Sequence, residues 1–508
     1  MRQQTRKPIE EMQVDQVKLE LNSRDDIPQV LGGLQYLFLN PILLEQVLKI
    51  LEGLFPKIDL SNGRPGMDMW SIFVMGVLRL NLNCDYDRLH NLVNNHKMIR
   101  QILGHGIVDD QHDYYLQTLK DNVSLLTPEM LDQINQVVVN AGHQLIKKKG
   151  PDDDQLLLPD PAVKEKLRGR CDSFVVETNV EYPTDTRLLF DSLRKVIQLL
   201  IPLCRRHQVE ESIDLGDIKR LKKLWRFLQK LKPSTSKDES KQASRQKEII
   251  AAHQAYLNFA KELVERADQK FEELEKKEGI DKNKLLKIKE FMNHARRQID
   301  QTDRRVIQGQ KIPHPEKVFS IFKPYTEWIH KGKAGVPVEL GVMVGIVEDQ
   351  HQFILHHRVM QQEVDVEVAV LMIQETKQRF PALSSCSFDQ GFHSPSNQRE
   401  LSGLLETVIL PKKGRLSKTD QERQQQVVFI EGRCQHAAVE SAIHALEVHG
   451  LDGCPDRELP AFKRYVALAI VARNLQILGR YIQQQERDLE KQRCQKQRCQ
   501  KQRCQKAA

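Results

Sequence analysis

Cys-Asp-Ser-Phe-Val-Val-Glu-Thr-Asn, residues 171–179, places an aspartate in a short apolar run that predicts a buried strand. A second aspartate, Asp389, follows the apolar run 383–388 in Cys-Ser-Phe-Asp-Gln-Gly-Phe-His-Ser. A third acid, Glu440, lies in Ala-Ala-Val-Glu-Ser-Ala-Ile on a strongly periodic helix. Buried carboxylates are costly unless something cationic meets them. Asp172, Asp389 and Glu440 on separate elements therefore predict a carboxylate site for divalent metal.

The order of elements around these acids predicts the fold class. After the first strand and a long insertion, we expect strands over 318–322, 336–347 and 353–360, a helix over 363–380, strand 383–388, a helix from Pro395 through 405, strand 408–410, and helices over 433–448 and 460–482. Without the insertion, this is the element order of an α/β RNase H-like catalytic core. The core is predicted to span 151–190 and 313–482.

Residues 1–150 predict an all-helical N-terminal domain that precedes the core. Trp70, Phe73, Val74, Val77 and Leu78 form one apolar stripe, and a second helix is expected over 85–103. Two short helices joined by a polar turn are either a DNA-reading pair or part of an ordinary helical bundle. The domain is the expected site of binding to DNA ends.

The remaining segments predict helices without a large core. Residues 191–312 form a large helical insertion, with a charged helical hairpin that turns near Gly279 and a flexible joint over 230–237. Residues 483–508 repeat Lys-Gln-Arg-Cys-Gln and predict a disordered basic tail. The tail's three cysteines do not share a helical face, which disfavours a metal site there.

Composition narrows the class of protein. A length of 508 residues suggests about three domains. Residues 491–508 carry seven basic residues and no acid, so residues 1–490 hold a net charge of only +1 of the total +8. DNA binding must therefore depend on local patches. We expect no membrane span and no secretory signal, and nine scattered cysteines fit a reducing, cytoplasmic location.

The three acids suit a metal-dependent phosphodiester chemistry. Mg²⁺ prefers oxygen ligands, and two such ions about 3.5–4 Å apart activate the attacking oxygen and stabilise the leaving oxygen. Val439, Ile443 and Leu446 predict a helix stripe that packs on the sheet, with Glu440 at its edge. Arg433 lies two turns earlier on the polar face, where it is placed to reach phosphate or to orient Glu440.

Other acids compete for the same roles. Glu177 is an odd number of residues from Asp172, so on a strand it faces the opposite way. Asp185 follows Pro183 and fits better as the N-cap of the next helix. Glu431 and Glu447 remain rivals of Glu440.

The chain resembles a DDE transposase of bacterial insertion sequences, close to the ISNCY-type group. The resemblance rests on the block after Asp172, the hairpin Lys331-Gly-Lys-Ala-Gly-Val-Pro-Val-Glu-Leu-Gly, Phe388-Asp-Gln-Gly-Phe-His-Ser, and Arg433 to Glu440 with Ala472-Arg-Asn-Leu. It covers most of residues 60–480. It implies cutting and joining of DNA at element ends, with Asp172, Asp389 and Glu440 as catalytic ligands of two Mg²⁺ ions, for which Mn²⁺ can substitute.

The resemblance also implies partners: double-stranded DNA with terminal inverted repeats, target DNA, and a second copy of the chain in a homodimer or larger assembly. Many relatives carry a lysine shortly after the third acid, where this chain has Glu447. The residues expected to bind DNA are Arg433, Lys331, Lys333, Lys412 and Lys413. The alternatives are another RNase H-like nuclease, and a decayed or repurposed copy that binds DNA without cleavage.

Overall fold

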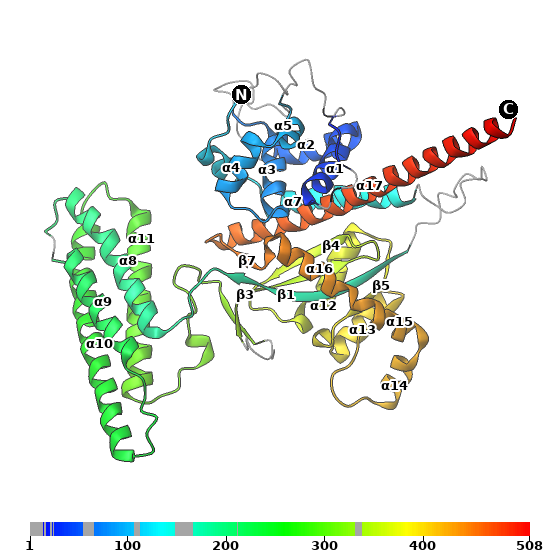
Figure 1. Ribbon diagram of the computed structural model, residues 1–508. Coiled ribbons are helices and arrows are strands. Elements are labelled where there is room, and N and C mark those ends of the chain that lie inside the picture. Colours follow the sequence, from blue (N-terminus) through cyan, green and yellow to red (C-terminus); the bar gives the residue numbers. More distant parts are fainter. Residues whose placement is uncertain are drawn as a thin grey trace. The chain divides into compact units, whose positions relative to one another are not determined.

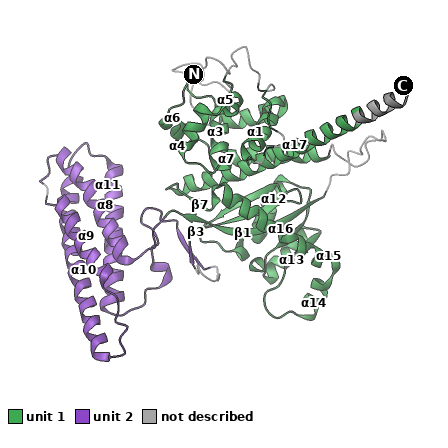
Figure 2. Ribbon diagram, in the orientation of Figure 1, with its two compact units in different colours: residues 1–179, 341–508 green, residues 180–340 purple. Residues whose placement is uncertain are grey.

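The computed structural model describes residues 14, 17–20, 23, 25–53, 66–105, 112–147, 166–210, 212–330 and 338–507. The chain divides into two compact units, one of residues 1–179 and 341–508 and the other of residues 180–340 (Figure 2). We call them unit 1 and unit 2. All three candidate acids lie in unit 1. Unit 2 contains the predicted helical insertion, 191–312, together with residues on either side of it.

A mixed sheet of seven strands contains the candidate acids' strands (Figure 1). The strands are β1 (Leu167–Thr178), β2 (Glu327–His330), β3 (Val338–Glu348), β4 (Ile354–Met360), β5 (Leu383–Phe388), β6 (Thr407–Ile409) and β7 (Gly453–Cys454). On one side, β1 pairs antiparallel with β3, which pairs antiparallel with β4. On the other side, β1 pairs parallel with β5, which pairs parallel with β6. The short strand β7 pairs parallel with the end of β1.

The predicted strands from 336 onward are confirmed to within a few residues, but the predicted strand 318–322 is wrong. Its backbone turns at Ser320, whose hydroxyl accepts hydrogen bonds from the amides of Phe322 and Lys323. Ile321 is buried in the helical core of unit 2. The apolar residues of this segment thus pack on helices, and no sheet partner is needed to bury them.

Helices cover both faces of the sheet in unit 1. Helix α12 (Asp365–Arg379) packs on one face, where Met372 Sδ lies 4.0 Å from Cys171 Sγ. Helices α15 (Val427–His436) and α16 (Ala438–Leu446) cover the other face. There, Arg170 donates a hydrogen bond to the Gln435 carbonyl oxygen at 3.4 Å. Successive residues of β1 therefore face different helices, as the alternation of a strand requires.

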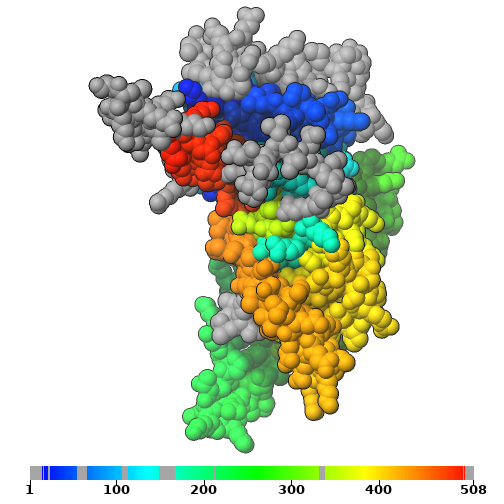
Figure 3. Space-filling model, turned by 90° about the vertical axis from the view of Figure 1, so that its right-hand side faces the viewer, coloured from blue at the N-terminus to red at the C-terminus, as the bar shows by residue number. Residues whose placement is uncertain are grey.

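Two further helices follow strands of the parallel half of the sheet. Helix α13 (Pro395–Leu404) begins at Ser394, whose hydroxyl accepts a hydrogen bond from the Asn397 amide, which confirms the predicted N-cap. Helix α14 (Lys418–Gln425) follows β6 and precedes α15. Figure 3 shows the surface that α14–α16 (orange) form beside the segment around residue 400 (yellow).

The N-terminal helices belong to unit 1. They are α1 (Asp26–Leu39), α2 (Pro41–Glu52), α3 (Met69–Asn81), α4 (Tyr86–Asn95), α5 (Lys97–Ile102), α6 (Leu116–Val123) and α7 (Pro128–Lys147). Among them, α1, α3 and α7 pack against the long helix α17 (Leu459–Ala507). A Cβ at Gly479 would lie 1.8 Å from the Gln29 carbonyl oxygen, so glycine permits the close approach of α17 to α1. The predicted N-terminal domain is thus packed into the same unit as the sheet.

The predicted apolar stripe from Trp70 to Leu78 is buried, and so is every other residue of α3. The predicted second helix, 85–103, is divided in two, because His96 ends α4 and caps α5 through Nδ1. A fully buried α3 cannot enter a DNA groove, which favours the ordinary-bundle interpretation for this pair.

Unit 2 is built from α8 (Asp185–Arg206), α9 (Leu215–Lys230), α10 (Glu239–Glu275) and α11 (Lys282–Thr302). The predicted hairpin is confirmed, with Gly279 in the left-handed region at φ +76° between α10 and α11. Buried Tyr256 of α10 donates a hydrogen bond to the Thr186 carbonyl oxygen at 3.0 Å. Thr184, not Asp185, caps α8, because its hydroxyl accepts from the Arg187 amide.

Helix α17 continues through the repeat tail to Ala507, where disorder was expected. Lys, Gln and Arg are good helix formers, and the repeat has no glycine or proline to end the helix. Among the described residues, no single helix has the length and apolar composition needed to cross a membrane; α1 and α2 pass that test only together, as a pair bent by 96°. The described cysteines form no disulfide.

Candidate active site

Strand register brings Asp172 and Asp389 to neighbouring positions. In the parallel pair of β1 and β5, the last matched residues are Cys171 and Phe388. Asp172 and Asp389 each follow one residue later. Residues at matched positions of adjacent strands lie about 5 Å apart with their side chains on the same face. The structure therefore brings together two acids that are 217 positions apart in the sequence.

Asp172 is half-buried and its carboxylate has one hydrogen-bond donor within the described residues, the Ser173 amide at 2.8 Å from Oδ1. Burial raises the pKa of Asp172 to about 7, although the Ser173 amide acts in the opposite direction. The charges of Asp389, Asp365 and Glu440 raise this pKa further. The pKa of Asp172 is thus affected by both of the other predicted acids, Asp389 and Glu440.

Asp365, at the first position of α12, is a fourth acid of this site that the sequence interpretation missed. The Ser173 hydroxyl donates a hydrogen bond to Asp365 Oδ1 at 2.7 Å. Burial raises the pKa of Asp365, and so does the charge of Asp389. A Cβ at Gly391 would lie 2.9 Å from Asp365 Oδ2, so the turn after Asp389 rests on this carboxylate.

Glu440 lies on α16 as the stripe predicted. Val439 and Leu446 are buried and Ile443 is half-buried, while Glu440 is exposed at the edge of that stripe. The expected single helix 433–448 is interrupted at Ala437, and residues 447–451 continue as a π-helical turn. Arg433 therefore lies on α15, outside the helix that carries Glu440, and it is exposed.

His436 joins this site from the end of α15. Its Nδ1 atom lies 3.0 Å from the Ser387 hydroxyl of β5. Burial lowers the pKa of His436, whereas the charges of Asp389 and Glu440 raise it. The imidazole is thus a neutral group at pH 7 beside the carboxylates. His436 is four residues before Glu440, and this helical spacing was the feature of the sequence that could have indicated its place in the site.

Arg170 provides a fixed positive charge two residues before Asp172. Its Nε lies 3.1 Å from Glu348 Oε2, and both side chains are largely buried, at 13% and 3% exposure. It also donates a hydrogen bond to the Asp349 carbonyl oxygen at 2.5 Å. Burial raises the pKa of Glu348 to about 7, although Arg170 lowers it. Arg170 is therefore held by the protein and is not free for a ligand.

The donors around Asp172 suit a hard divalent cation by their chemistry, because carboxylate oxygens are the ligands that Mg²⁺ prefers. Burial is the main cause of the raised pKa of Asp172, and the charges of the neighbouring acids add to it. However, no group of three or more His, Cys, Asp or Glu side chains within the described residues is close enough together to hold a metal ion. The candidate ligands share one region without converging on one point.

The other candidates differ in their surroundings. Glu177 is exposed near the end of β1, where β7 pairs. Asp185 forms an ion pair with Arg305 at 2.7 Å. Glu431 is exposed on α15, and Glu447 Oε2 lies 3.7 Å from His444 Nδ1.

The expected DNA-binding lysines are only partly described. Lys331 and Lys333 lie outside the described residues. Lys412 pairs with Asp420 at 2.7 Å, and Lys413 is exposed. Of the named candidates in the described part of the chain, Lys413 and Arg433 thus present an exposed charge.

A hollow of about 470 Å³ lies on the face of the sheet to which Arg170 points. Arg168 and Arg170 of β1 line it together with Ser385 and Ser387 of β5. On each strand, these residues are two positions apart and so point to the same face of the sheet. Asp172 comes two positions after Arg170, and Asp389 comes two positions after Ser387. The strand positions that line the hollow therefore lead toward the two aspartates.

No family model, no curated protein and no solved structure matches the chain.

Proposed function

We propose that unit 1 contains an RNase H-like catalytic core and that the protein is a DDE-type transposase. The sheet supports this proposal: strands β4, β3 and β1 are successive antiparallel neighbours, and β5 and β6 extend the sheet parallel to β1. The single observation that carries it is the register of β1 and β5, in which Asp172 and Asp389 each directly follow the last matched pair, Cys171 and Phe388.

In this proposal Asp172, Asp389 and Glu440 hold two Mg²⁺ ions, or Mn²⁺ in their place. The bound ions would supply Lewis-acid charge for hydrolysis of a phosphodiester and for strand transfer. The protein's own part is to hold four carboxylates near one another, with Asp365 oriented by Ser173. The proposal requires the exposed Asp389 and Glu440 side chains to approach Asp172 more closely than they do in this structure.

The neighbouring side chains have supporting roles. Ser387 holds His436 through Nδ1 near the carboxylates, and burial lowers the pKa of this imidazole. The buried pair of Arg170 and Glu348 anchors the strand segment that carries Asp172. These contacts limit the movement of the acids during the reaction.

The proposed substrates are double-stranded DNA with terminal inverted repeats and a target DNA. Joining two ends implies at least a homodimer on DNA, in the bacterial cytoplasm at the nucleoid. A specific observation favours a second candidate, a transposase-derived protein that binds DNA without cleavage: the candidate ligands do not converge.

Strand cleavage separates these two functions. The substrate is a linear duplex that contains the gene's own flanking repeats, incubated with Mg²⁺ or with EDTA. Wild-type protein is expected to nick the repeat ends only with Mg²⁺. Asp389→Asn is expected to reduce the rate at least about 10²-fold, because charge stabilisation at the reacting phosphate is lost.

Glu431→Gln is the matched control, since Glu431 is an exposed acid of α15 in the same unit. Equal cleavage by wild-type protein and Asp389→Asn would disprove the assigned site. Binding of the repeats without any cleavage by the wild-type protein would favour the second candidate.

A further inference from the structure

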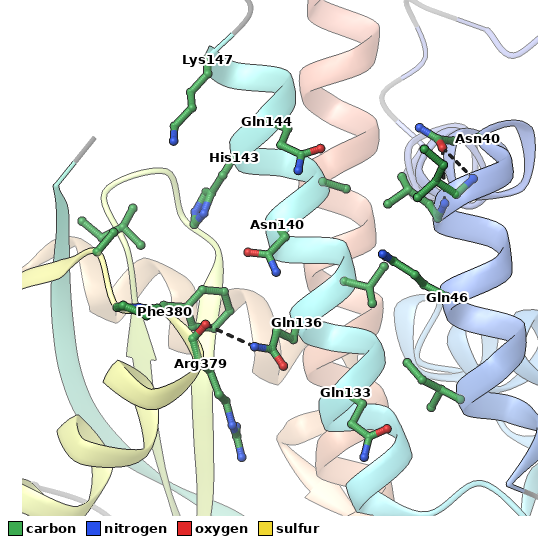
Figure 4. Close-up of a pocket in the computed structure, with 18 of the residues that line it drawn as sticks. Asn40, Gln46, Gln133, Gln136, Asn140, His143, Gln144, Lys147, Arg379 and Phe380 are labelled. Carbon is green, nitrogen blue, oxygen red and sulfur yellow. Dashed lines mark hydrogen bonds between the residues drawn. The ribbon is translucent and has the colours of Figure 1, made fainter. Parts of the chain in front are cut away.

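A groove in unit 1 lies along α7 and is lined by residues that the proposed catalytic site does not use. Its volume is about 890 Å³. Figure 4 shows α7 between α2 on one side and the segment of Arg379 and Phe380 on the other. We call it the amide groove. The residues that matter for the argument are Gln46, Lys49, Gln133, Asn140, Gln144 and Lys147.

The α7 side chains form a regular stripe. Gln133, Gln136, Asn140, Gln144 and Lys147 follow one another at steps of three or four residues, so they lie along one face of the helix. Figure 4 shows them along the length of α7. Solvent-facing helical stripes usually carry charged residues. Here the stripe is made of amides, which both donate and accept hydrogen bonds, and it ends in a lysine.

Most of these groups have no partner within the described residues. Gln136 donates to the Arg379 carbonyl oxygen at 3.2 Å, and Asn40 caps α2. No hydrogen bond or ion pair joins the side chain of Gln46, Gln133, Asn140, Gln144, Lys49 or Lys147 to another described residue. The amide groove therefore offers free donors along its length, between the apolar side chains that form most of its exposed lining.

The charge of the lining has one sign. Lys49, Lys147 and Arg379 line the groove, and no aspartate or glutamate of the described residues does. Arg379 is neutralised by Asp132 at 2.5 Å, and His143 pairs with Asp349 at 2.6 Å. Lys49 on α2 and Lys147 on α7 thus remain as uncompensated, exposed cations. Cations and side-chain amides are the groups that contact DNA phosphates and sugars.

We propose that the amide groove seats one sugar–phosphate backbone of duplex DNA, with Lys49 and Lys147 on phosphates and the α7 amides between them. The proposal rests on the proposed function for its choice of a polynucleotide. Helix α7 lies at the bottom of the groove, between α2 and the segment of Arg379 and Phe380. It can therefore contact the sugar–phosphate backbone of DNA, but it cannot enter the major groove. The contacts are therefore expected to be independent of DNA sequence.

Fluorescence anisotropy of a labelled mixed-sequence duplex tests this proposal in EDTA across a series of KCl concentrations. Each phosphate contact contributes about 0.9 to the slope of log K against log salt. The double variant Lys49→Ala/Lys147→Ala is expected to reduce the slope by about 1.8, with at least roughly tenfold weaker binding at low salt. Gln133→Ala/Asn140→Ala is expected to weaken binding several-fold with an unchanged slope.

Lys261→Ala is the matched control, because Lys261 is an exposed lysine of α10 outside the groove. Its slope is expected to stay at the wild-type value. An unchanged slope in the double lysine variant, with wild-type circular dichroism, would overturn the proposal. Competition by a poly-glutamate peptide as effective as that by unlabelled duplex would also overturn it, since the groove would then recognise an acidic protein.

The test is independent of catalysis. Binding in EDTA is measured without metal, so it reports on the groove and not on the metal chemistry of the candidate acids. A failure of the groove proposal thus leaves the cleavage result unaffected, and a failure of cleavage leaves the salt slopes interpretable.

Discussion

The region around Asp172 and the amide groove carry charges of opposite sign. Around Asp172, burial raises the pKa of a half-buried carboxylate to about 7, and the charges of three further acids act in the same direction. Along α7, no acid of the described residues lines the groove, and two exposed lysines have no ion-pair partner there. The region around Asp172 is negatively charged and is expected to bind cations. The amide groove is positively charged and is expected to bind an anion. Substitutions should therefore change stability in the first region and binding in the second.

Loss of the buried arginine beside the acids should have the largest effect on stability. Arg170→Met removes the partner of Glu348, whose side chain is 3% exposed. An unpaired buried carboxylate costs about 3–5 kcal/mol. Chemical denaturation should show this loss at pH 8. The loss should be smaller at pH 5, because Glu348 has a raised pKa and then takes up a proton.

Asp172→Asn should have the opposite sign. The folded-state pKa of Asp172 is about 7, above its value of 3.8 in the unfolded chain, so the ionised carboxylate destabilises the fold as pH rises through this range. In metal-free buffer the variant should be more stable than wild type by roughly 1–3 kcal/mol above pH 7. This gain should vanish below about pH 4. A pH-independent difference would contradict the raised pKa of Asp172.

Ser173→Ala should have a smaller effect in the same region. It removes the hydroxyl that donates to Asp365 Oδ1 at 2.7 Å. The expected loss is about 1–2 kcal/mol, measured by denaturant unfolding at pH 8. Ser173→Thr retains a hydroxyl and serves as the control. Similar losses in both variants would show that packing, not the hydrogen bond, sets the effect.

Asn140→Asp in the amide groove should have the smallest effect on stability, within about 0.5 kcal/mol, because Asn140 is exposed. The same change should weaken DNA binding by placing a carboxylate beside a phosphate. Asn140→Gln is the neutral control. A stability loss above 1 kcal/mol would mean that the groove residues hold the fold together.

Sequence alone indicated much of this arrangement and missed parts for identifiable reasons. The sequence pattern placed Asp172 in a strand and Asp389 directly after another. The register of these two parallel strands puts each aspartate one residue after the last matched pair. Asp365 escaped notice because an acid in the first turn of a helix is expected from the helix dipole alone. Its pairing with Ser173 depends on how α12 packs on β1, which local patterns do not encode.

For unit 2 and for the C-terminal tail, too, part of the structure could be predicted from the sequence and part could not. The helical character of residues 191–312 was evident, but the boundary of unit 2 depends on packing that also buries Ile321. The repeat tail was expected to be disordered because it lacks apolar residues, yet its helix formers continue α17. The amide groove was not predicted, since its two walls come from α2 and from the segment around Phe380.

Calorimetric titration of the protein with Mn²⁺ tests the central claim most directly. We expect saturable binding to the wild-type protein and to Glu177→Gln, the exposed acid on the same strand. Binding should be lost in both Asp172→Asn and Asp389→Asn, because each variant removes one carboxylate of the pair. Equal Mn²⁺ binding by wild type and both aspartate variants would contradict the assignment of this pair as the metal-dependent catalytic site.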